Sequence, residues 1–465
     1  MSAITATAAP EAPARAAAPG NRTTLLLEGP ILATLLSLAW PNVLVMVFQA
    51  STGLIETFWV SRLGSDALAG MALVFPGYMM MTMLSAGAVG GGIASAVARA
   101  LGAGRRQDAD ALVLHALVIN LGLGLLTSAL FLIFGGAIYT TMGGEGASLH
   151  AALAYSNVIF AGNALMWVMN AFASVIRGSG VMKFPSLVIC IGVALLVPLS
   201  PLFIFGFGPL PGMGIAGGGV AVVFTTALMA ALLGWYVVFG KGLVRLRRTR
   251  LSAKLFADIL RVGAAGAVNT LTTTLTVAAT TGLVGAAAGP DGVAGYGTGS
   301  RLEYLLIPLV FGIGAPLVAM VGANVGAGRR KRALQIALTG AAVSFALCEA
   351  IGLAAAIWPG AWLGLFGSNP AMLAIGGAYL RWVGPAYGFF GLGLALYFAS
   401  QGAGKLAWPL IGGVLRLALA VGGGWLALRL TGSVGAVFAM LGLALIAYGA
   451  VIAMAVRSGA WFRRA

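Results

Sequence analysis

The stretch Gly102-Ala-Gly-Arg-Arg106 occurs twice in the chain, because the same five residues return as Gly326-Ala-Gly-Arg-Arg330. The two copies lie 224 positions apart in a chain of 465 residues. The same offset pairs Arg177-Gly-Ser-Gly180 with Gln401-Gly-Ala-Gly404. Registers that agree across both halves indicate an internal duplication. Each copy of GAGRR lies between two long apolar runs, so we interpret it as a basic loop between two membrane helices. We therefore expect two related lobes.

The composition excludes a soluble enzyme. Hydrophobic residues make up 60% of the chain and charged residues 8%, and the mean hydropathy is +1.00. A soluble domain carries about a quarter charged residues. The net charge of +16 could suggest a nucleic-acid partner. However, the basic residues sit in short loops between apolar runs, which is the pattern of membrane proteins whose basic loops face the cytoplasm. We expect the lipid bilayer as a partner and no nucleic acid.

Apolar runs of about 20 residues or more predict an all-α membrane protein with twelve transmembrane helices, in two pseudo-symmetric six-helix lobes around a central cleft. The predicted spans are approximately 31–60, 67–98, 109–139, 149–176, 184–206, 214–239, 255–286, 292–323, 333–357, 370–400, 408–429 and 434–456. We divide the chain into a disordered cytoplasmic tail (1–28), an N-lobe (29–240), a basic cytoplasmic linker (241–254), a C-lobe (255–458) and a cytoplasmic C-terminus (459–465).

The placement of Lys and Arg predicts the orientation. Most of the 27 basic residues fall on the side of the predicted spans that carries both termini, whereas only Arg62 and Arg429 fall in loops on the opposite side. Both termini are therefore expected in the cytoplasm of a multi-pass protein of the inner (plasma) membrane. Two lobes of six spans insert with the same orientation, and rocking one against the other would give alternating access to the cleft.

Nucleotide, metal and redox chemistry are not indicated. The glycine runs Gly87–Gly92 and Gly214–Gly219 follow no strand and precede no Lys-Ser or Lys-Thr, so we do not interpret them as phosphate-binding loops. Cys190 and Cys348 have no Cys-x-x-Cys spacing and no histidine beside them. We expect a protein that is not an enzyme, binds no cofactor or metal, acts as a monomer and draws on an ion gradient.

Ionisable residues inside the predicted spans are candidates for function, because a charge at the bilayer centre costs on the order of 3 kcal/mol. The arginines are always charged and fit structural counter-ions, whereas Glu349 fits either an ion pair or a functional role. The set is Glu56, Arg301, Glu303, Glu349, Arg381 and Arg416.

Glu56 is the strongest candidate for binding a coupling ion. Its half of the chain has no equally deep arginine, and its span is unusually polar, with Asn42, Gln49, Ser51 and Thr52. A carboxylate without a partner and out of water can exchange a proton near neutral pH or bind Na⁺. The alternative is an exposed glutamate near the outer helix end. Asn170 could add an amide oxygen to the same site, or could simply bond a neighbouring helix.

Four further residues are candidates for lining the substrate cavity: Gln49, Asn269, Glu303 and Tyr387. Asn269 opens a run of threonines in the seventh span. Glu303 lies roughly 18 Å deep, near the midplane, at about 1.5 Å per helical residue, although a structural ion pair is equally consistent with that depth. Tyr387 could stack on a cation, although aromatic side chains inside membrane bundles usually serve packing.

Motifs throughout residues 30–455 resemble one transporter family. They are Gly53-Leu-Ile-Glu-Thr57 with Leu63-Gly64 and Ala67-Leu-Ala-Gly70, the GAGRR loop, Arg177-Gly-Ser-Gly180, Gly212-Met-Gly-Ile-Ala-Gly-Gly218, Gly299-Ser-Arg-Leu-Glu-Tyr304 and Val321-Gly-Ala-Asn-Val-Gly-Ala-Gly328. In order and spacing they are similar to the MATE family, the multidrug and toxic compound extrusion transporters, and the second-lobe motifs resemble its DinF-like branch.

The resemblance implies export of organic, often cationic compounds against entry of H⁺ or Na⁺. It also implies that Glu56 stands where family members carry the coupling carboxylate of the first span. Two positions depart from the family. Many members have aspartate at the place of Glu56, and some use an acid in the seventh span, where this chain has none before Asp291. Glu303 is the nearest substitute.

Three hypotheses follow. The first is a cation-coupled antiporter that exports cationic or amphipathic small molecules by alternating access. The second is a flippase for lipid-linked saccharides or other lipid-linked precursors, for which twelve spans with uncharged outer loops are less suitable. The third is a non-transporting scaffold, against which the duplication and the buried carboxylates argue. The substrate, and the choice between H⁺ and Na⁺, stay open at this level.

Overall fold

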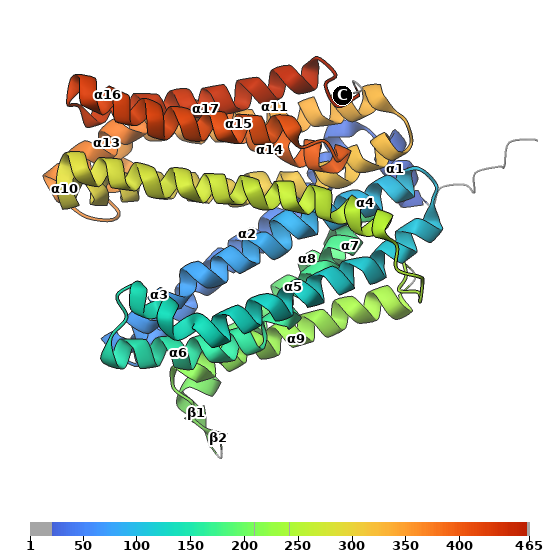
Figure 1. Ribbon diagram of the computed structural model, residues 1–465, viewed down its shortest axis with the longest axis horizontal. Coiled ribbons are helices and arrows are strands. Elements are labelled where there is room, and N and C mark those ends of the chain that lie inside the picture. Colours follow the sequence, from blue (N-terminus) through green and yellow to red (C-terminus); the bar gives the residue numbers. More distant parts are fainter. Residues whose placement is uncertain (1–20, 209, 241, 463–465) are drawn as a thin grey trace, which may run out of the picture.

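The computed structural model describes residues 21–208, 210–240 and 242–462, and it is almost entirely helical (Figure 1). In chain order the elements are α1 (Asn21–Glu28), α2 (Ile31–Ser61), α3 (Ser65–Thr82), the π-helix η1 (Met83–Val89), α4 (Gly90–Gly102), α5 (Arg106–Thr141), α6 (Gly146–Ala161), α7 (Asn163–Gly178), α8 (Lys183–Phe205), the short antiparallel hairpin β1 (Gly206–Phe207) and β2 (Leu210–Pro211), α9 (Ile215–Phe239), α10 (Ala253–Gly326), α11 (Arg330–Ile357), α12 (Pro359–Leu363), α13 (Pro370–Val383), the 3₁₀-helix η2 (Gly384–Ala386), α14 (Tyr387–Ala403), α15 (Ala407–Leu417), the π-helix η3 (Ala418–Gly423), α16 (Gly424–Thr431) and α17 (Val434–Arg457).

The helices account for the twelve predicted spans. Within the described residues, ten helices, or eleven when α6 and α7 are joined across their 45° bend, are long and apolar enough to cross a membrane. Of these, α10 has 74 residues, which at 1.5 Å per residue would be about 110 Å long as one rod. The chain instead leaves helical geometry at Gly289, where φ is 62° and ψ is −160°. Two spans therefore meet there, which completes the twelve.

The buried apolar side chains form two large clusters, one in each lobe. The N-lobe cluster includes Ile93 and Trp167, and the C-lobe cluster includes Leu396 and Phe438. In Figure 1 the helices from α2 to α9 form the lower body and those from α10 to α17 the upper one. The division into two bodies follows from the apolar faces that each set of spans must bury.

The first helix of each lobe also packs into the other lobe. Leu35 in the first turns of α2 belongs to the C-lobe cluster, whereas Ile259 near the start of α10 belongs to the N-lobe cluster. Leu35 and Ile259 are separated by the same 224 positions as the two GAGRR copies. The exchange is therefore symmetric, as expected of two repeats that face each other.

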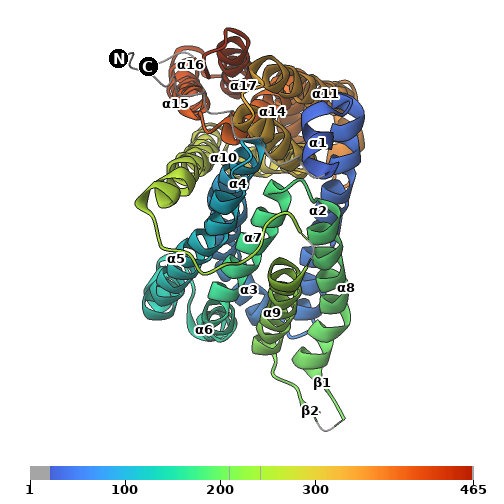
Figure 2. The same ribbon diagram turned by 90° about the vertical axis from the view of Figure 1, so that its right-hand side faces the viewer.

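The lobes meet most closely where the two GAGRR loops lie, which we call the GAGRR end. Here α4 of the N-lobe packs along α10 of the C-lobe (Figure 2). A methyl group on Gly102 would overlap the carbonyl of Ala323, and one on Gly326 would overlap the carbonyl of Arg99. Because Ala323 and Arg99 are also repeat partners, the two contacts are equivalent under the pseudo-symmetry of the lobes. Small residues permit such close approach between membrane helices.

Polar contacts add to this closure. Ser95 Oγ donates to the carbonyls of Gln401 and, at 3.1 Å, Gly402, and the Arg99 guanidinium donates to the Gly402 carbonyl at 3.4 Å. These carbonyls end α14, where the helix dipole favours a cation. Towards α3 and α6 on one side and α13 and α16 on the other, the two bodies diverge (Figure 1).

One expectation about the N-terminal tail was wrong. Residues 21–28, which we had placed in a disordered segment, form α1, because Leu26 and Leu27 are buried against the C-lobe. Asn324 Nδ2 donates to the Leu26 carbonyl at 3.0 Å, and Arg329 bonds both the Leu27 carbonyl at 2.9 Å and the Glu28 carboxylate at 3.1 Å. The rest of the predicted tail lies outside the described residues, as do residues 463–465.

The segment between α9 and α10 follows the predicted linker except that α10 already begins at Ala253. It is fastened to α5 of the N-lobe. The Arg245 amide donates to Asp110 at 2.9 Å, and the Ser252 amide donates to His115 Nε2 at 2.8 Å. Its first residue, Lys241, is outside the described part.

We predict that Gly102→Ala or Gly326→Ala forces the lobes apart at the GAGRR end, because either methyl group meets a backbone carbonyl of the other lobe. Alanine favours a helix over glycine by about 1 kcal/mol, so helix propensity would not cause the effect. Spin labels at positions 106 and 330, with Cys190 and Cys348 replaced by alanine, should report longer distances than in the parent.

The matched control is Gly122→Ala in α5, where an added methyl group meets no atom within 4 Å. It should leave the distance distribution unchanged. Unchanged distributions in the two interface variants as well would contradict the proposed close contact.

Candidate functional site

Glu56 lies in the part of α2 that belongs to the N-lobe. Its Oε1 atom is buried and has no hydrogen-bond partner among the side chains that the structure describes. The hydroxyls of Tyr78 in α3 and Tyr155 in α6 are close enough for its charge to act on them, and both tyrosines pack with the N-lobe core. No described Lys or Arg forms an ion pair with Glu56. This arrangement leaves a carboxylate oxygen free to take a proton or a small cation.

Asn170 lies in α7, on another part of the N-lobe core. Its Nδ2 donates to Ser85 Oγ in η1 at 3.1 Å. Asn170 contacts Ser85, whereas Glu56 lies near Tyr78. Ser85 follows Tyr78 by seven residues, which is about 10 Å of helix, so the two sites lie at different turns of the same span. No hydrogen bond joins the two within the described residues. The bulged turn of η1 is of a kind that is frequent at functional sites.

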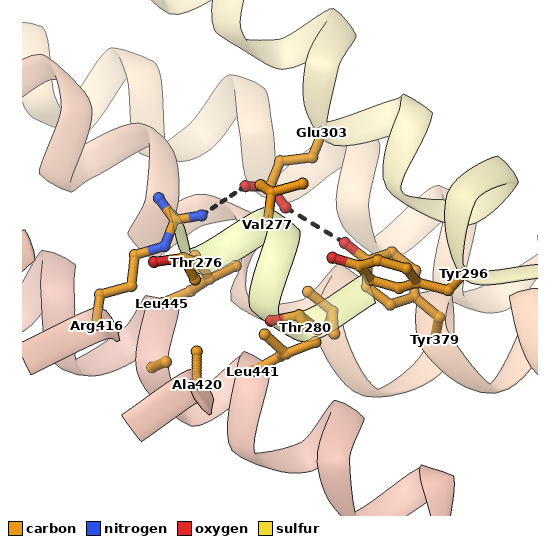
Figure 3. A pocket seen from close by; sticks show the side chains of 12 residues that line it. Thr276, Val277, Thr280, Tyr296, Glu303, Tyr379, Arg416, Ala420, Leu441 and Leu445 are labelled. Atoms are coloured by element: carbon orange, nitrogen blue, oxygen red, sulfur yellow. Dashed lines mark hydrogen bonds and ion pairs between the residues drawn. The ribbon is translucent and has the colours of Figure 1, made fainter. Parts of the chain in front are cut away.

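Glu303 occupies a pocket inside the C-lobe, with about 330 Å³ of empty space (Figure 3). Its Oε1 accepts from the Arg416 guanidinium at 2.9 Å, and its Oε2 accepts from the Tyr379 hydroxyl at 3.3 Å. Tyr387 donates to Tyr379 at 3.4 Å. In Figure 3 Arg416 and Tyr379 lie on opposite sides of the carboxylate. Glu303 is thus the centre of a paired polar cluster rather than a free acid.

Aromatic rings hold Arg416 in place. Its guanidinium carbon lies 5.4 Å from the centre of the Phe390 ring and 5.9 Å from that of Tyr448, distances that allow cation–π attraction. The pairing agrees with the interpretation of Arg416 as a counter-ion. By contrast, Arg301 is exposed, with its guanidinium over the Phe366 ring at 5.5 Å.

Glu349 has a backbone partner. It accepts the Gly388 amide at 2.8 Å, at the start of α14, directly after the break at η2. The first turn of a helix has free N–H groups, which are costly in a membrane unless they are bonded. Glu349 therefore satisfies a backbone amide that the break between α13 and α14 leaves without a helical partner.

The remaining predicted cavity residues are spread over both lobes. Asn269 faces α15, since a methyl group on Gly413 would lie 3.3 Å from its Oδ1, and Thr276 and Thr280 continue its helix into the Glu303 pocket. Tyr387 is fully buried in the C-lobe core. The side chain of Gln49 lies outside the described residues. The structure therefore brings Glu303 and Tyr387 together through Tyr379 and leaves Asn269 two helical turns away from Thr276.

Sequence reasoning missed the tyrosines at positions 78, 155 and 379. In an apolar span a tyrosine is consistent with ordinary packing, so the residue type alone carried no signal. The sequence also did not indicate that Glu303 pairs with Arg416, because 113 positions separate the two residues. The only available sign was that both are ionisable and deep in the same lobe.

The family model MatE matches residues 41–202 and 266–426, one block in each lobe. The chain is 26% identical over 381 residues to a protein named FAD transporter from Shewanella oneidensis, covering 81% of this chain and 82% of the relative. It is 30% identical over 328 residues to the probable multidrug resistance protein NorM of Deinococcus radiodurans, covering 68% and 69%.

Solved structures share the fold. A MOP superfamily transporter from Pyrococcus furiosus superposes with a TM-score of 0.87 at 22% identity, over 96% of this chain and 99% of that one. An outward-facing multidrug resistance MATE family transporter gives 0.85 at 23%, over 94% and 97%. With two duplicated blocks matched over more than half its length and twelve spans in two lobes, the chain belongs to the MatE family of membrane transporters.

Proposed function

We propose that the protein exports organic small molecules, cationic or amphipathic in character, in exchange for H⁺ or Na⁺. The observation that carries the proposal is the buried oxygen of Glu56 without a partner in the described N-lobe. Relatives named multidrug resistance proteins support export of organic compounds. The protein would act as a monomer in the inner membrane.

Sidedness follows from charge. The basic loops Arg105–Arg106 and Arg329–Arg332 lie at the GAGRR end, which the positive-inside rule assigns to the cytoplasm. The lobes are closed there and diverge at the opposite end (Figure 1). The conformation is then the one that faces outward, ready to release substrate and to take up an ion.

The two deep carboxylates, Glu56 and Glu303, have different surroundings. A single coupling site, located in the N-lobe, is consistent with this difference. Glu303 has Arg416 as a permanent counter-charge, so it needs no cation from solution. Glu56 has none among its described neighbours, and only a bound proton or Na⁺ can neutralise it. We therefore assign ion coupling to Glu56 and a structural role to the Glu303–Arg416 pair, while Asn170 would support the packing around η1.

Helix α2 can carry the effect of the ion to the lobe contact. Its later turns hold Glu56 among N-lobe residues, whereas Leu35 and Ala39 in its first turns pack in the C-lobe core. A change of charge at one end therefore acts on a helix that is anchored in both lobes. An ion that binds one arrangement of α2 better than the other shifts the equilibrium between the outward and inward states.

Two alternatives concern the substrate. The name of the Shewanella oneidensis relative, which matches 81% of this chain, favours export of a flavin dinucleotide by the same mechanism as a second candidate. A flippase for lipid-linked saccharides is less favoured, because the family match and the relatives named multidrug resistance proteins both support efflux.

We predict that Glu56→Gln abolishes ion-driven transport, because glutamine is isosteric but cannot exchange a proton or balance a cation. Inverted vesicles containing the protein should take up a fluorescent cationic dye when a pH gradient or a Na⁺ gradient is imposed, each tested alone. The active gradient identifies the ion. Uptake by Glu56→Gln should fall at least about tenfold, whereas Glu56→Asp should retain part of it.

The control is Glu145→Gln, which changes an exposed carboxylate in the loop before α6 and should transport normally. If Glu56→Gln vesicles respond to the gradient as the parent does, Glu56 is not the coupling residue.

We also predict that the Glu303–Arg416 pair stabilises the C-lobe without coupling ions. Arg416→Met leaves a mostly buried carboxylate unpaired, and we expect a loss on the order of 2 kcal/mol, below the ~3–5 kcal/mol of fully buried pairs because both side chains keep some exposure. Adding Glu303→Gln should recover much of the thermal stability in detergent. A stable double variant that no longer responds to either gradient would refute the structural role.

A further inference from the structure

A second pocket lies between the two lobes near the GAGRR end, with about 360 Å³ of empty space. Ten of its twelve lining residues form five repeat pairs at the offset of 224 positions: Gly87 with Phe311, Gly91 with Ala315, Ala94 with Val318, Ser174 with Phe398, and Arg177 with Gln401. Both members of each of these pairs line the same pocket. The pocket therefore lies on the pseudo-two-fold axis that relates the lobes.

Arg177 brings an unsatisfied charge to this pocket. It ends α7, and its guanidinium makes no hydrogen bond or ion pair with any described residue, although its Nε atom is buried. No carboxylate lines the pocket. The nearby Arg99 differs, because it is bonded to Ser95 and to the Gly402 carbonyl. Of the two arginines at this contact, only Arg177 lacks an acceptor.

Gln401 occupies the equivalent position on the other side of the axis. It is fully buried, and its Nε2 donates to the Gly87 carbonyl at 3.1 Å, while its Oε1 has no partner in the described structure. Its amide lies flat against Gly91, where a methyl group would overlap it. The repeat partner of Gly91 is Ala315. The methyl group of Ala315 therefore occupies, on the side of Arg177, the space that Gly91 leaves free for the amide of Gln401. The pocket therefore carries one positive charge, off the axis.

A half-buried guanidinium without an acceptor at the lobe interface is costly, since its buried Nε–H group loses water and gains no hydrogen bond. The groups that match it are planar or tetrahedral oxyanions, which accept two parallel N–H bonds from arginine. Separation of the lobes at this end would open the pocket to the same side as the basic loops and present Arg177 to a solute there.

We propose that Arg177 binds an acidic group, carboxylate or phosphate, of the transported compound when the lobes part at the GAGRR end. The proposal rests on the proposed alternating-access function and narrows its substrate class to amphipathic organic compounds that carry an oxyanion, zwitterions included. Closure packs Gln401 onto Gly91 and narrows the space beside Arg177, so the closed, outward-facing state would hold that group less well.

The test measures binding directly, without any ion gradient. The full-length protein in nanodiscs of zwitterionic lipid is titrated by calorimetry with pyrophosphate and, separately, with benzoate, at constant ionic strength maintained with choline chloride. Arg177→Gln makes the pocket neutral and places glutamine at this position on both sides of the axis. It should weaken binding of the preferred anion by about tenfold to a hundredfold, as expected for charge-assisted hydrogen bonds. Comparing the two anions distinguishes phosphate from carboxylate.

Two further variants make the result specific. Arg177→Gln combined with Gln401→Arg moves the charge across the axis, and because the pocket is shared it should restore binding to within about threefold of the parent. Arg381→Gln removes an exposed arginine of α13 and should change nothing. Unfolding midpoints without ligand establish that each variant is folded.

Equal dissociation constants for the parent and Arg177→Gln, or no binding of either anion to the parent, would overturn the proposal. So would a folded exchange variant that does not regain binding. None of these results bears on the gradient experiment with Glu56→Gln, so the proposed ion coupling can stand when the anion site falls. The reverse also holds.

Discussion

The close approach of α4 and α10 at the GAGRR end is the contact on which the rest of the architecture depends. Gly102 and Gly326 bring backbone against backbone across the two lobes, and this closeness positions Ser95 and Arg99 to bond the last carbonyls of α14. A membrane supplies little hydrophobic drive between helices, so packing of small residues and backbone hydrogen bonds must hold such a contact. These interactions are individually weak, which suits a contact that has to open and close.

The bilayer also explains how the ionisable groups are distributed. Most intramembrane charges in the described structure have found a partner: Glu303 has Arg416 and Tyr379, and Glu349 has the Gly388 amide. Glu56 inside the N-lobe and Arg177 between the lobes each have a buried polar atom without a partner among the described residues, whereas Arg301 and Arg381 are exposed. Because unpaired charge in a membrane is expensive, these two exceptions are the places where a bound ion or solute would contribute most to stability.

Most of the architecture could be predicted from the sequence, because the bilayer requires long apolar runs for each span and favours basic residues in the loops on one side. The repeat of GAGRR also indicated the two related lobes. Contacts between side chains that are distant in the sequence have no comparable sequence pattern. Neither the Glu303–Arg416 pair nor the tyrosines beside Glu56 follow from spacing along the chain, since both depend on how separate helices rotate against each other. The helical order of residues 21–28 was missed because it depends on burial against Asn324 and Arg329, more than 290 positions away.

Leu35 and Ile259 show that each lobe completes its core with the opening helix of its counterpart. A half-length chain built on this plan could not satisfy its own apolar surface. It would have to trade that helix with a second copy, as swapped dimers do. Fusion of two such copies into one polypeptide would turn an intermolecular exchange into an internal one, after which the two members of each pair were free to diverge. Arginine on one side of the axis and glutamine on the other is a difference that identical subunits could never have acquired.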